Sequence, residues 1–379
     1  MLKNRHIHIL RWFMSSLMAV LFTAIASSCD DDAEPRKQTM LTVYVYSPER
    51  AATLSRAETG NVNAAVEEAT IHSLQIWIYE SESKAYVAYL STEDVTTLNM
   101  GEGATYQLPV TDDFAERKPD VNVYVLANVK AANCGVTTLD DQTSHPDLLD
   151  GAKIAKSYFG LGVLLKPLVR TVPAEGLPMA GKLTVQPVVG DAPALRVGTM
   201  EQVATVQLTR AVSKLRFIFA KTTGQPAVSI TSIKMKEGMI PDEEYLFKTP
   251  ASMTYNSPAA ELLGSTKGDI AATTNPTDFL YFDQEAQAYE DLISNAGLTV
   301  EGPIYLRESD RQLEGTIHYT IDGGDELTTD FQMHQAGDFL RNHTWIVYAY
   351  YAGSDRLQVQ SLYVKEWGLE EKNHELYNW

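Results

Sequence analysis

Short runs of alternating apolar and polar residues recur along most of the chain, and this pattern most constrains its fold. Residues 41–46 read Leu-Thr-Val-Tyr-Val-Tyr, with Leu and Val at every second position. Residues 71–79, 202–209 and 312–322 repeat the pattern, and Gly, Pro, Asn and Asp punctuate the chain between runs. A period of two residues is typical of strands with one buried face. Many such runs with few convincing helices predict an all-β protein.

The other expected strands have similar length and punctuation. They cover residues 85–90, 105–110, 121–127, 182–189, 215–220, 227–235, 279–282, 303–306, 326–333, 344–349 and 357–367. Asp322-Gly323-Gly324-Asp325 predicts a hairpin turn between two of these runs. Beyond the strands we expect a helical turn at residues 64–69 and short helices at residues 144–151 and 153–160. Residues 236–275 are expected to be mostly loop.

Two alternating runs meet almost directly at residues 208–215. A chain of this length has room for two domains, and its 44% hydrophobic residues are ample for two cores. We therefore predict two β-sandwich domains, residues 40–211 and 212–379, with the boundary near residue 211. The short junction between the runs favours a fairly fixed angle between the domains.

The N-terminus has the pattern of an export signal. A positively charged start precedes an apolar run over residues 12–26, and small residues then lead to Cys29. The run is too short and interrupted for a stable membrane span, so residues 1–28 are predicted to be a signal peptide. Small residues before a cysteine are typical of a bacterial lipobox, in which Cys29 would carry the lipid. Cleavage near Ser28 by an ordinary signal peptidase is the alternative.

The segment after Cys29 suits a membrane tether. Residues 29–39 begin with an acidic run and include a proline, a composition that cannot build a core. The remaining cysteine, Cys134, has no partner if Cys29 is acylated, so no disulfide is expected. The net charge is −18, and removal of the three basic residues of the signal would make it −21. Such a charge argues against nucleic-acid binding, which requires a basic surface.

A search for catalytic patterns finds none. The sequence contains no Gly-rich phosphate loop, no His-x-x-x-His or Cys-x-x-Cys motif and no Gly-x-Ser-x-Gly motif. His318 and His334 could meet across the expected hairpin, but two histidines without a carboxylate partner are weak evidence for a metal site. We therefore expect neither an enzyme nor a metal site, and no cofactor.

A polar segment follows the first expected strand. It is rich in small residues and carries Arg50 and Arg56. Exposed segments of this kind are preferred sites of proteolysis. From spacing alone, solvated loop charges are the favoured interpretation of both arginines.

These pieces, taken in order, resemble the fimbrillins, the type V pilins of Bacteroides-type bacteria, which are exported as lipoproteins. The resemblance covers nearly the whole chain. The features that carry it are the signal ending at Cys29, the strand at residues 41–46 with the arginine segment behind it, and the segments Leu74–Tyr79, Leu177–Gly181, Val206–Lys214 and Leu362–Trp367.

The resemblance implies two transthyretin-like β-sandwiches that assemble by strand exchange. In fimbrillins an arginine-specific outer-surface protease cuts behind the first strand, and a C-terminal strand of the neighbouring subunit fills the opened groove. Here the cut would fall between Arg56 and Ala57, with Arg50 as the alternative. The displaced strand would carry Leu41, Val43 and Val45, and the donor strand would carry Leu357, Val359, Leu369, Leu376 and Trp379.

The resulting prediction is a structural subunit of a surface fimbria that supports adhesion, with the stalk as the expected position. Its partners would be further copies of itself, other fimbrial subunits, the protease and, through the lipid, the outer membrane. The precursor would be anchored to the cell outer membrane and the processed subunit would be extracellular. A tip or anchor subunit is the alternative within the family. A surface glycan-binding lipoprotein is the alternative outside it, and would require exposed aromatic platforms.

Overall fold

The structure is a computed structural model. It describes residues 39–46, 66–92, 103–129, 149, 153–154, 172–185, 189–191, 204–247, 252–263, 268–280, 297–333, 339–354 and 356–364. Residues 39–379 form one compact unit, separate from residues 1–38, which lie outside the described part. Strands account for most elements of the described residues, so the predicted all-β class is confirmed.

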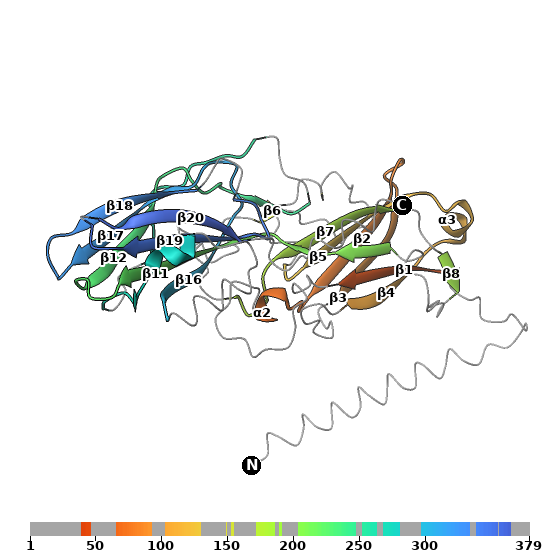
Figure 1. The fold of residues 1–379 in the computed structure, drawn as a ribbon. Coiled ribbons are helices and arrows are strands. Elements are labelled where there is room, and N and C mark those ends of the chain that lie inside the picture. Colours follow the sequence, from red (N-terminus) through yellow and green to blue (C-terminus); the bar gives the residue numbers. More distant parts are fainter. Residues whose placement is uncertain are drawn as a thin grey trace, which may run out of the picture. The chain divides into compact units, whose positions relative to one another are not determined.

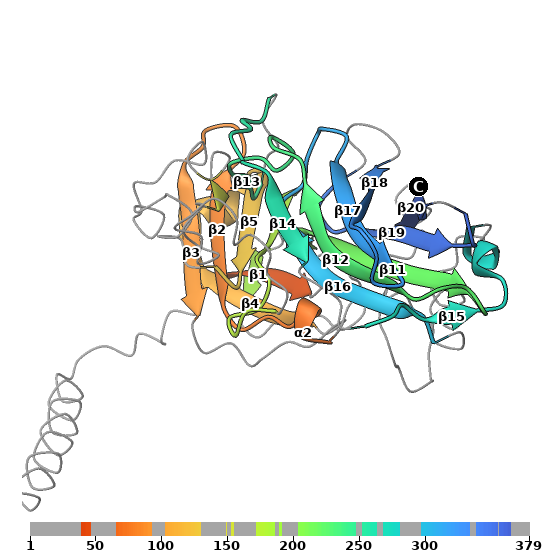
Figure 2. The same ribbon diagram turned by 90° about the vertical axis from the view of Figure 1, so that its left-hand side faces the viewer.

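The first half of the chain contributes two facing sheets. The β1 sheet is built on β1, which runs from Thr39 to Tyr46. Its neighbours are β4 (Gly103–Pro109), β8 (Val189–Asp191) and β9 (Ala204–Gln207). The β2 sheet has five strands. In order they are β10 (Thr209–Arg210), β7 (Met179–Val185), β5 (Val121–Ala127), β2 (Leu74–Glu80) and β3 (Tyr86–Thr92). Figure 2 shows β2, β3 and β5 side by side, with β1 and β4 behind them.

The second half contributes two further sheets. The β11 sheet contains β15 (Ala272–Thr273), β11 (Ser213–Thr222), β19 (Thr344–Tyr351), β20 (Gln358–Val364) and β16 (Thr299–Leu306). The β12 sheet has four strands. In order they are β14 (Ala260–Leu263), β12 (Val228–Met235), β17 (Glu314–Ile321) and β18 (Leu327–Gln332). Residues Tyr319 and Leu327 pair next to the turn, which confirms the predicted hairpin.

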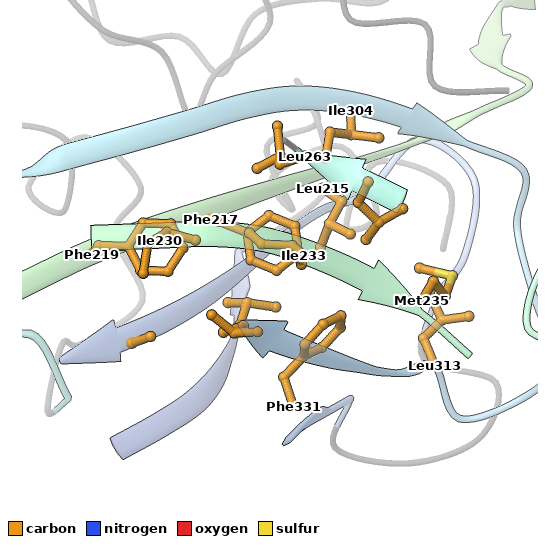
Figure 3. Close-up of a cluster of buried hydrophobic side chains, with 14 of the residues drawn as sticks. Leu215, Phe217, Phe219, Ile230, Ile233, Met235, Leu263, Ile304, Leu313 and Phe331 are labelled. Atoms are coloured by element: carbon orange, nitrogen blue, oxygen red, sulfur yellow. The ribbon is translucent and has the colours of Figure 1, made fainter. Parts of the chain in front are cut away.

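Each pair of sheets encloses a hydrophobic core. Side chains from both the β11 and β12 sheets fill the second core, as Figure 3 shows. In it Phe217 packs edge-to-face on Phe331, with ring centroids 5.4 Å apart. The first core likewise combines residues of the β1 and β2 sheets, including Val43 and Ile76. Alternation places one face of each strand inward, which is why the sequence pattern predicts these cores.

β2 is buried on both faces. Ile76 and Ile78 point into the first core, whereas Trp77 and Tyr79 belong to a third cluster on the opposite face of the sheet. Leu246 and Phe247, from the second half of the chain, join this third cluster. Their segment follows β13 (Glu244–Tyr245), which pairs with β6 (Lys153–Ile154).

The predicted boundary near residue 211 falls between β10 and β11. β10 ends at Arg210 and β11 begins at Ser213, so the chain passes almost directly from one strand to the next, as the sequence indicates. The division into domains at this point, and the transthyretin-like description of each half, stay predictions. The proposed segments 1–28 and 29–39 contain no described residue except Thr39.

Helical elements differ more from expectation. Residues 279–282 are predicted as a strand, but Pro276–Leu280 form the 3₁₀ helix η3, with Pro276 at its first position. Lys153 and Ile154 are predicted to start a helix and instead form β6, because pairing with β13 overrides local preference. The expected helical turn is present as α2 (Val66–Ala69). One short helix, α3 (Asp112–Arg117), was not predicted, although Thr111 caps it by accepting a hydrogen bond from the Phe114 amide at 3.2 Å.

Candidate functional site: the first strand and its anchor

β1 is an interior strand of its sheet. Residues 40–46 pair antiparallel with β4, and residues 39–41 pair antiparallel with β8. Beyond Thr42, residues 43–46 pair in parallel with β9. Figure 1 shows β1 between β4 and β8. One side of β1 is therefore lined by a single strand, and the other side by two strands that run in opposite directions.

The inner face of β1 is a row of aliphatic side chains. Leu41, Val43 and Val45 are fully buried in the first core. Their direct partners on β4 are Leu108, Tyr106 and Ala104 respectively, so the whole row faces apolar neighbours. Burial raises the pKa of Tyr106 in this row. The structure thus places the three predicted inner residues of the first strand together in the core.

The outer face of β1 carries polar and aromatic residues. Tyr44 and Tyr46 stack on each other with ring centroids 6.2 Å apart, and both are half-buried. Tyr46 pairs directly with Gly103 of β4. β1 therefore has a strictly alternating character, aliphatic inside and aromatic or polar outside.

The chain re-enters the described structure at α2, where Glu68 is almost completely buried. The Glu68 carboxylate forms an ion pair with Lys214 of β11, with an N–O distance of 2.9 Å, and accepts a hydrogen bond from the Tyr305 hydroxyl. The Glu68 carbonyl oxygen accepts a hydrogen bond of 2.8 Å from Arg210. Arg210 also donates to the Asn342 side chain at 3.0 Å. We call Glu68, Arg210, Lys214, Tyr305 and Asn342 the anchor cluster.

The anchor cluster holds two basic groups in a desolvated site. Burial lowers the pKa of Lys214 to about 8, although the Glu68 carboxylate opposes the change. Burial lowers the pKa of Arg210 to about 10, again against the effect of Glu68. Buried charges persist when they are paired, and the Glu68 carboxylate pairs with Lys214 and also favours the charged form of Arg210.

A second contact fixes the residues just after α2. Asn128 accepts a hydrogen bond of 2.7 Å from the His72 amide and donates from its side-chain nitrogen to the carbonyls of Thr70 and Leu177, at 2.8 and 2.9 Å. Asn128 is buried and has φ of 62°, a left-handed conformation that Asn tolerates better than most residues. The chain is thus tied down at residues 68 to 72, immediately after the arginine-containing segment.

The comparisons with known proteins point to one family. Residues 39–210 match the family model described as major fimbrial subunit protein (FimA). The resemblance to the fimbrillins is confirmed over these residues. No curated protein matches the chain.

Several solved structures are similar to this chain. A candidate cell adhesion protein from Parabacteroides distasonis has a TM-score of 0.54 at 14% identity, over 88% of this chain and 97% of that one. A candidate cell adhesion protein from Bacteroides eggerthii has a TM-score of 0.48 at 15% identity, over 89% and 98%. The tip fimbrial protein Mfa3 from Porphyromonas gingivalis, with C-terminal truncation, has a TM-score of 0.48 at 12% identity, over 86% and 100%. The first of these shows a shared fold.

Several predicted fimbrillin sites lie outside the described residues. These are the lipidation site Cys29, the cleavage-site residues Arg50, Arg56 and Ala57, and the donor-strand residues Leu369, Leu376 and Trp379. The donor residues Leu357 and Val359 are described, and they pack in the chain's own second core. There β20 pairs with β19 of the same chain, so this part of the expected donor strand already completes its own sheet.

The anchor cluster is the part of the site that sequence reasoning missed. Arg210 and Lys214 stand in an apolar stretch, at the ends of two adjoining strands, and this is a signal for buried charge. The position of their partner, Glu68, was not visible, because it lies more than a hundred residues earlier.

Other site types find no support in the described part of the chain. No group of three or more His, Cys, Asp or Glu side chains there could hold a metal ion. None of the described helices has the length and apolar character needed to cross a membrane. On the β2 sheet, Trp77, Tyr79 and Tyr124 are buried, whereas Tyr86 and Tyr89 of β3 are half-buried against them.

Proposed function

We propose that this chain is a structural subunit, in the stalk, of a surface fimbria, and that removal of β1 by proteolysis makes it competent for strand exchange. The observation that carries the proposal is the position of β1. It is an interior strand with a fully buried inner face, and residues 47–65 join it to the rest of the body. The family match over residues 39–210 supports the same reading.

The energetics of β1 make its removal consequential. Full burial of an aliphatic side chain contributes about 1.5–3 kcal/mol, so Leu41, Val43 and Val45 together supply about 5–9 kcal/mol. A folded domain has a net stability of only about 5–15 kcal/mol. Removal would also leave the backbone groups of β4, β8 and β9 without their strand partner. The empty groove would therefore bind a replacement strand strongly.

The covalent connection explains why the uncut chain would stay monomeric. A tethered strand competes at a high effective concentration, so an intermolecular strand cannot displace it easily. Cleavage at Arg56 converts β1 into a separate peptide held only by non-covalent contacts. A strand from a neighbouring subunit can then take its place by β-augmentation.

The anchor cluster defines what remains after the cut. Glu68 is held by Lys214, Tyr305 and Arg210, and the segment behind it is held by Asn128. Residues from α2 onward would therefore stay on the body, and only the segment before it would leave. Cleavage in residues 47–65 would also separate the lipid at Cys29 from the folded subunit, and would release it from the outer membrane into an extracellular fibre.

We propose that the donated strand is the C-terminal segment, and that the part inserted into the neighbouring subunit lies after Val364. Leu357 and Val359 already fill the chain's own core, so donating them would cost the subunit part of its second sandwich. Leu369, Leu376 and Trp379 lie outside the described residues. A tip subunit need not donate a strand, and an anchor would keep its lipid, so cleavage together with donation favours the stalk.

The test is polymerisation of purified precursor after digestion with an arginine-specific protease. Wild-type protein should give a size ladder on non-denaturing gels. Arg56→Ala should remain uncut and monomeric, and Arg50→Ala serves as the matched control that still forms the ladder. Deletion of residues 368–379 should leave cleavage intact and stop polymerisation.

Two results would overturn the mechanism. The first is wild-type protein that stays monomeric after complete cleavage, and the second is an undiminished ladder from the truncated form. Lipidation is tested separately, because Cys29→Ala should abolish labelling with palmitate and membrane association of the precursor. Labelled lipid on the Cys29→Ala protein would contradict the assignment of Cys29.

A further inference from the structure

Gly103, at the start of β4, lies under the ring of Tyr44. A Cβ atom built on Gly103 would lie 2.1 Å from the hydroxyl oxygen of Tyr44, 2.3 Å from its Cζ and 2.9 Å from its Cε1, so it would clash with the hydroxyl end of the ring. All three nearest atoms belong to this one side chain. The ring of an outer-face residue of β1 therefore occupies the space where any other residue of β4 would carry its side chain.

The backbone does not require glycine at this position. The positive φ angles of the described glycines fall at other positions, and Gly103 keeps a conformation open to any residue. Glycine in a strand lowers stability because it adds backbone entropy and no packing. An aromatic ring placed across a glycine from the neighbouring strand restores that packing. Tyr44 is in the right place for this, since it pairs with Thr105, two residues along β4 from Gly103.

We call the space beside Gly103 that the Tyr44 side chain fills the notch; of the described strands, only β1 pairs with β4 at this place. Among the described strands β4 pairs only with β1, so no third strand covers this edge. A strand that replaced β1 without an aromatic residue at this register would leave the backbone at Gly103 uncovered. A strand shifted by one residue would turn an aliphatic side chain toward the notch and the aromatic ring toward the core.

We propose that Gly103 is a register-selecting notch, and that the β1 groove prefers an incoming strand of a second subunit with an aromatic residue on its outer face at the position of Tyr44. This inference rests on the proposed strand exchange, and adds to it a rule for which strand is accepted and in which register. The inner aliphatic row supplies most of the affinity, because three fully buried side chains contribute to it. The notch supplies selectivity.

The experiment uses the full mature chain with a site-specific protease sequence inserted within residues 47–65. The cut protein is exchanged with fluorescent synthetic peptides of residues 39–46, and affinity is measured by competition. The peptide variants are Tyr44→Ala, Tyr44→Phe and, as a matched outer-face control, Thr42→Ala. The same series is repeated on protein carrying Gly103→Ala.

On the unaltered protein, Tyr44→Ala should bind about fivefold more weakly, as expected for one lost cross-strand aromatic contact. Tyr44→Phe should retain the affinity, and Thr42→Ala should change it less than Tyr44→Ala does. On Gly103→Ala protein the wild-type peptide should lose its advantage over Tyr44→Ala. Coupling between positions 44 and 103 is the signature of the notch, since a general loss of packing would not depend on position 103.

The outcomes separate the two proposals. If the cut protein binds no peptide of the series, strand exchange itself fails. If it binds all peptides with equal affinity, exchange stands and the notch is refuted. If Gly103→Ala protein does not fold, the comparison of Tyr44→Ala, Tyr44→Phe and Thr42→Ala on unaltered protein still decides, because a preference for both aromatic residues is required.

Discussion

Glu68→Gln should be one of the most destabilising single changes in the described part of the chain. The substitution keeps the shape of the side chain and removes its charge. Glu68 and Lys214 have side chains only 1% and 2% exposed, and their charged atoms are 2.9 Å apart. Arg210 is fully buried beside them. The variant would remove the carboxylate that pairs with Lys214 and that favours the charged form of Arg210, while both basic groups stay in a desolvated site.

The expected loss follows from that geometry. Breaking a buried ion pair by removing one partner costs about 3–5 kcal/mol, whereas an exposed pair contributes less than about 1 kcal/mol. Lys214 can limit the loss by releasing its proton, since burial already lowers its pKa to about 8 and removal of Glu68 lowers it further. The loss should therefore be greatest near pH 6 and become smaller as the pH rises toward 9.

Urea denaturation of purified uncut protein at several pH values measures this. Glu82→Gln, on an exposed glutamate, is the matched control and should change stability by less than about 0.5 kcal/mol. The double variant Glu68→Gln/Lys214→Met removes both charges and should recover most of the loss. A Glu68→Gln protein within about 1 kcal/mol of wild type at pH 6, with an unchanged pH profile, would refute the reasoning that buried charge pairing holds α2 in place.

Three further predictions concern the same region. Leu41→Ala should lower the free energy of unfolding by about 2–5 kcal/mol through the cavity it leaves, whereas Thr42→Ala on the outer face should have little effect in the same urea titration. Gly181→Ala should cost about 1–3 kcal/mol, because its Cβ would lie 2.6 Å from the carbonyl oxygen of Gln207; an unshifted thermal midpoint would contradict this. Lys214 has a folded pKa of about 8 and an ordinary value of 10.5, so its contribution to stability should rise from pH 8 to 10.5; Lys214→Met should lack this rise when unfolding is followed across that range.

Strands were predictable from the sequence because their alternation is a local property. The row Leu41, Val43 and Val45 reads directly as a buried face, and the turn at residues 322–325 fixes the hairpin of β17 and β18. The two faces of β2 are also visible in the sequence, since Leu74, Ile76 and Ile78 alternate with Trp77 and Tyr79. A double-sided strand of that composition has to lie between two packed layers.

Short elements were harder, because tertiary pairing decides them. β6 has two residues, and its strand conformation depends on β13, about ninety positions later in the chain. The apolar residues at the end of η3 resemble a strand, yet Pro276 starts a helical turn before them. α3 did have a local signal, a Thr followed by two Asp residues at a helix start. Its six residues carry too little periodicity to be recognised among strands.

The candidate site likewise has one part that the sequence predicts and one part that depends on contacts between distant residues. The first strand and its inner residues follow from the local pattern, but the anchor depends on which distant carboxylate meets Arg210 and Lys214. Their apolar surroundings in the sequence point to burial, but they do not identify the partner. Only the structure shows both within reach of Glu68.

The anchor also bears on how long an emptied groove would keep its shape. β9 forms one wall of the groove, and among the described strands it pairs with β1 alone. Loss of β1 would therefore remove its only strand partner, and an isolated segment of this length has little intrinsic stability. The chain leaves β9 through Leu208 and reaches Arg210, whose guanidinium is bound to Glu68 and Asn342. Because this attachment involves no residue of β1, it would persist if β1 left in the proposed exchange, and it would hold β9 in place for a replacement strand.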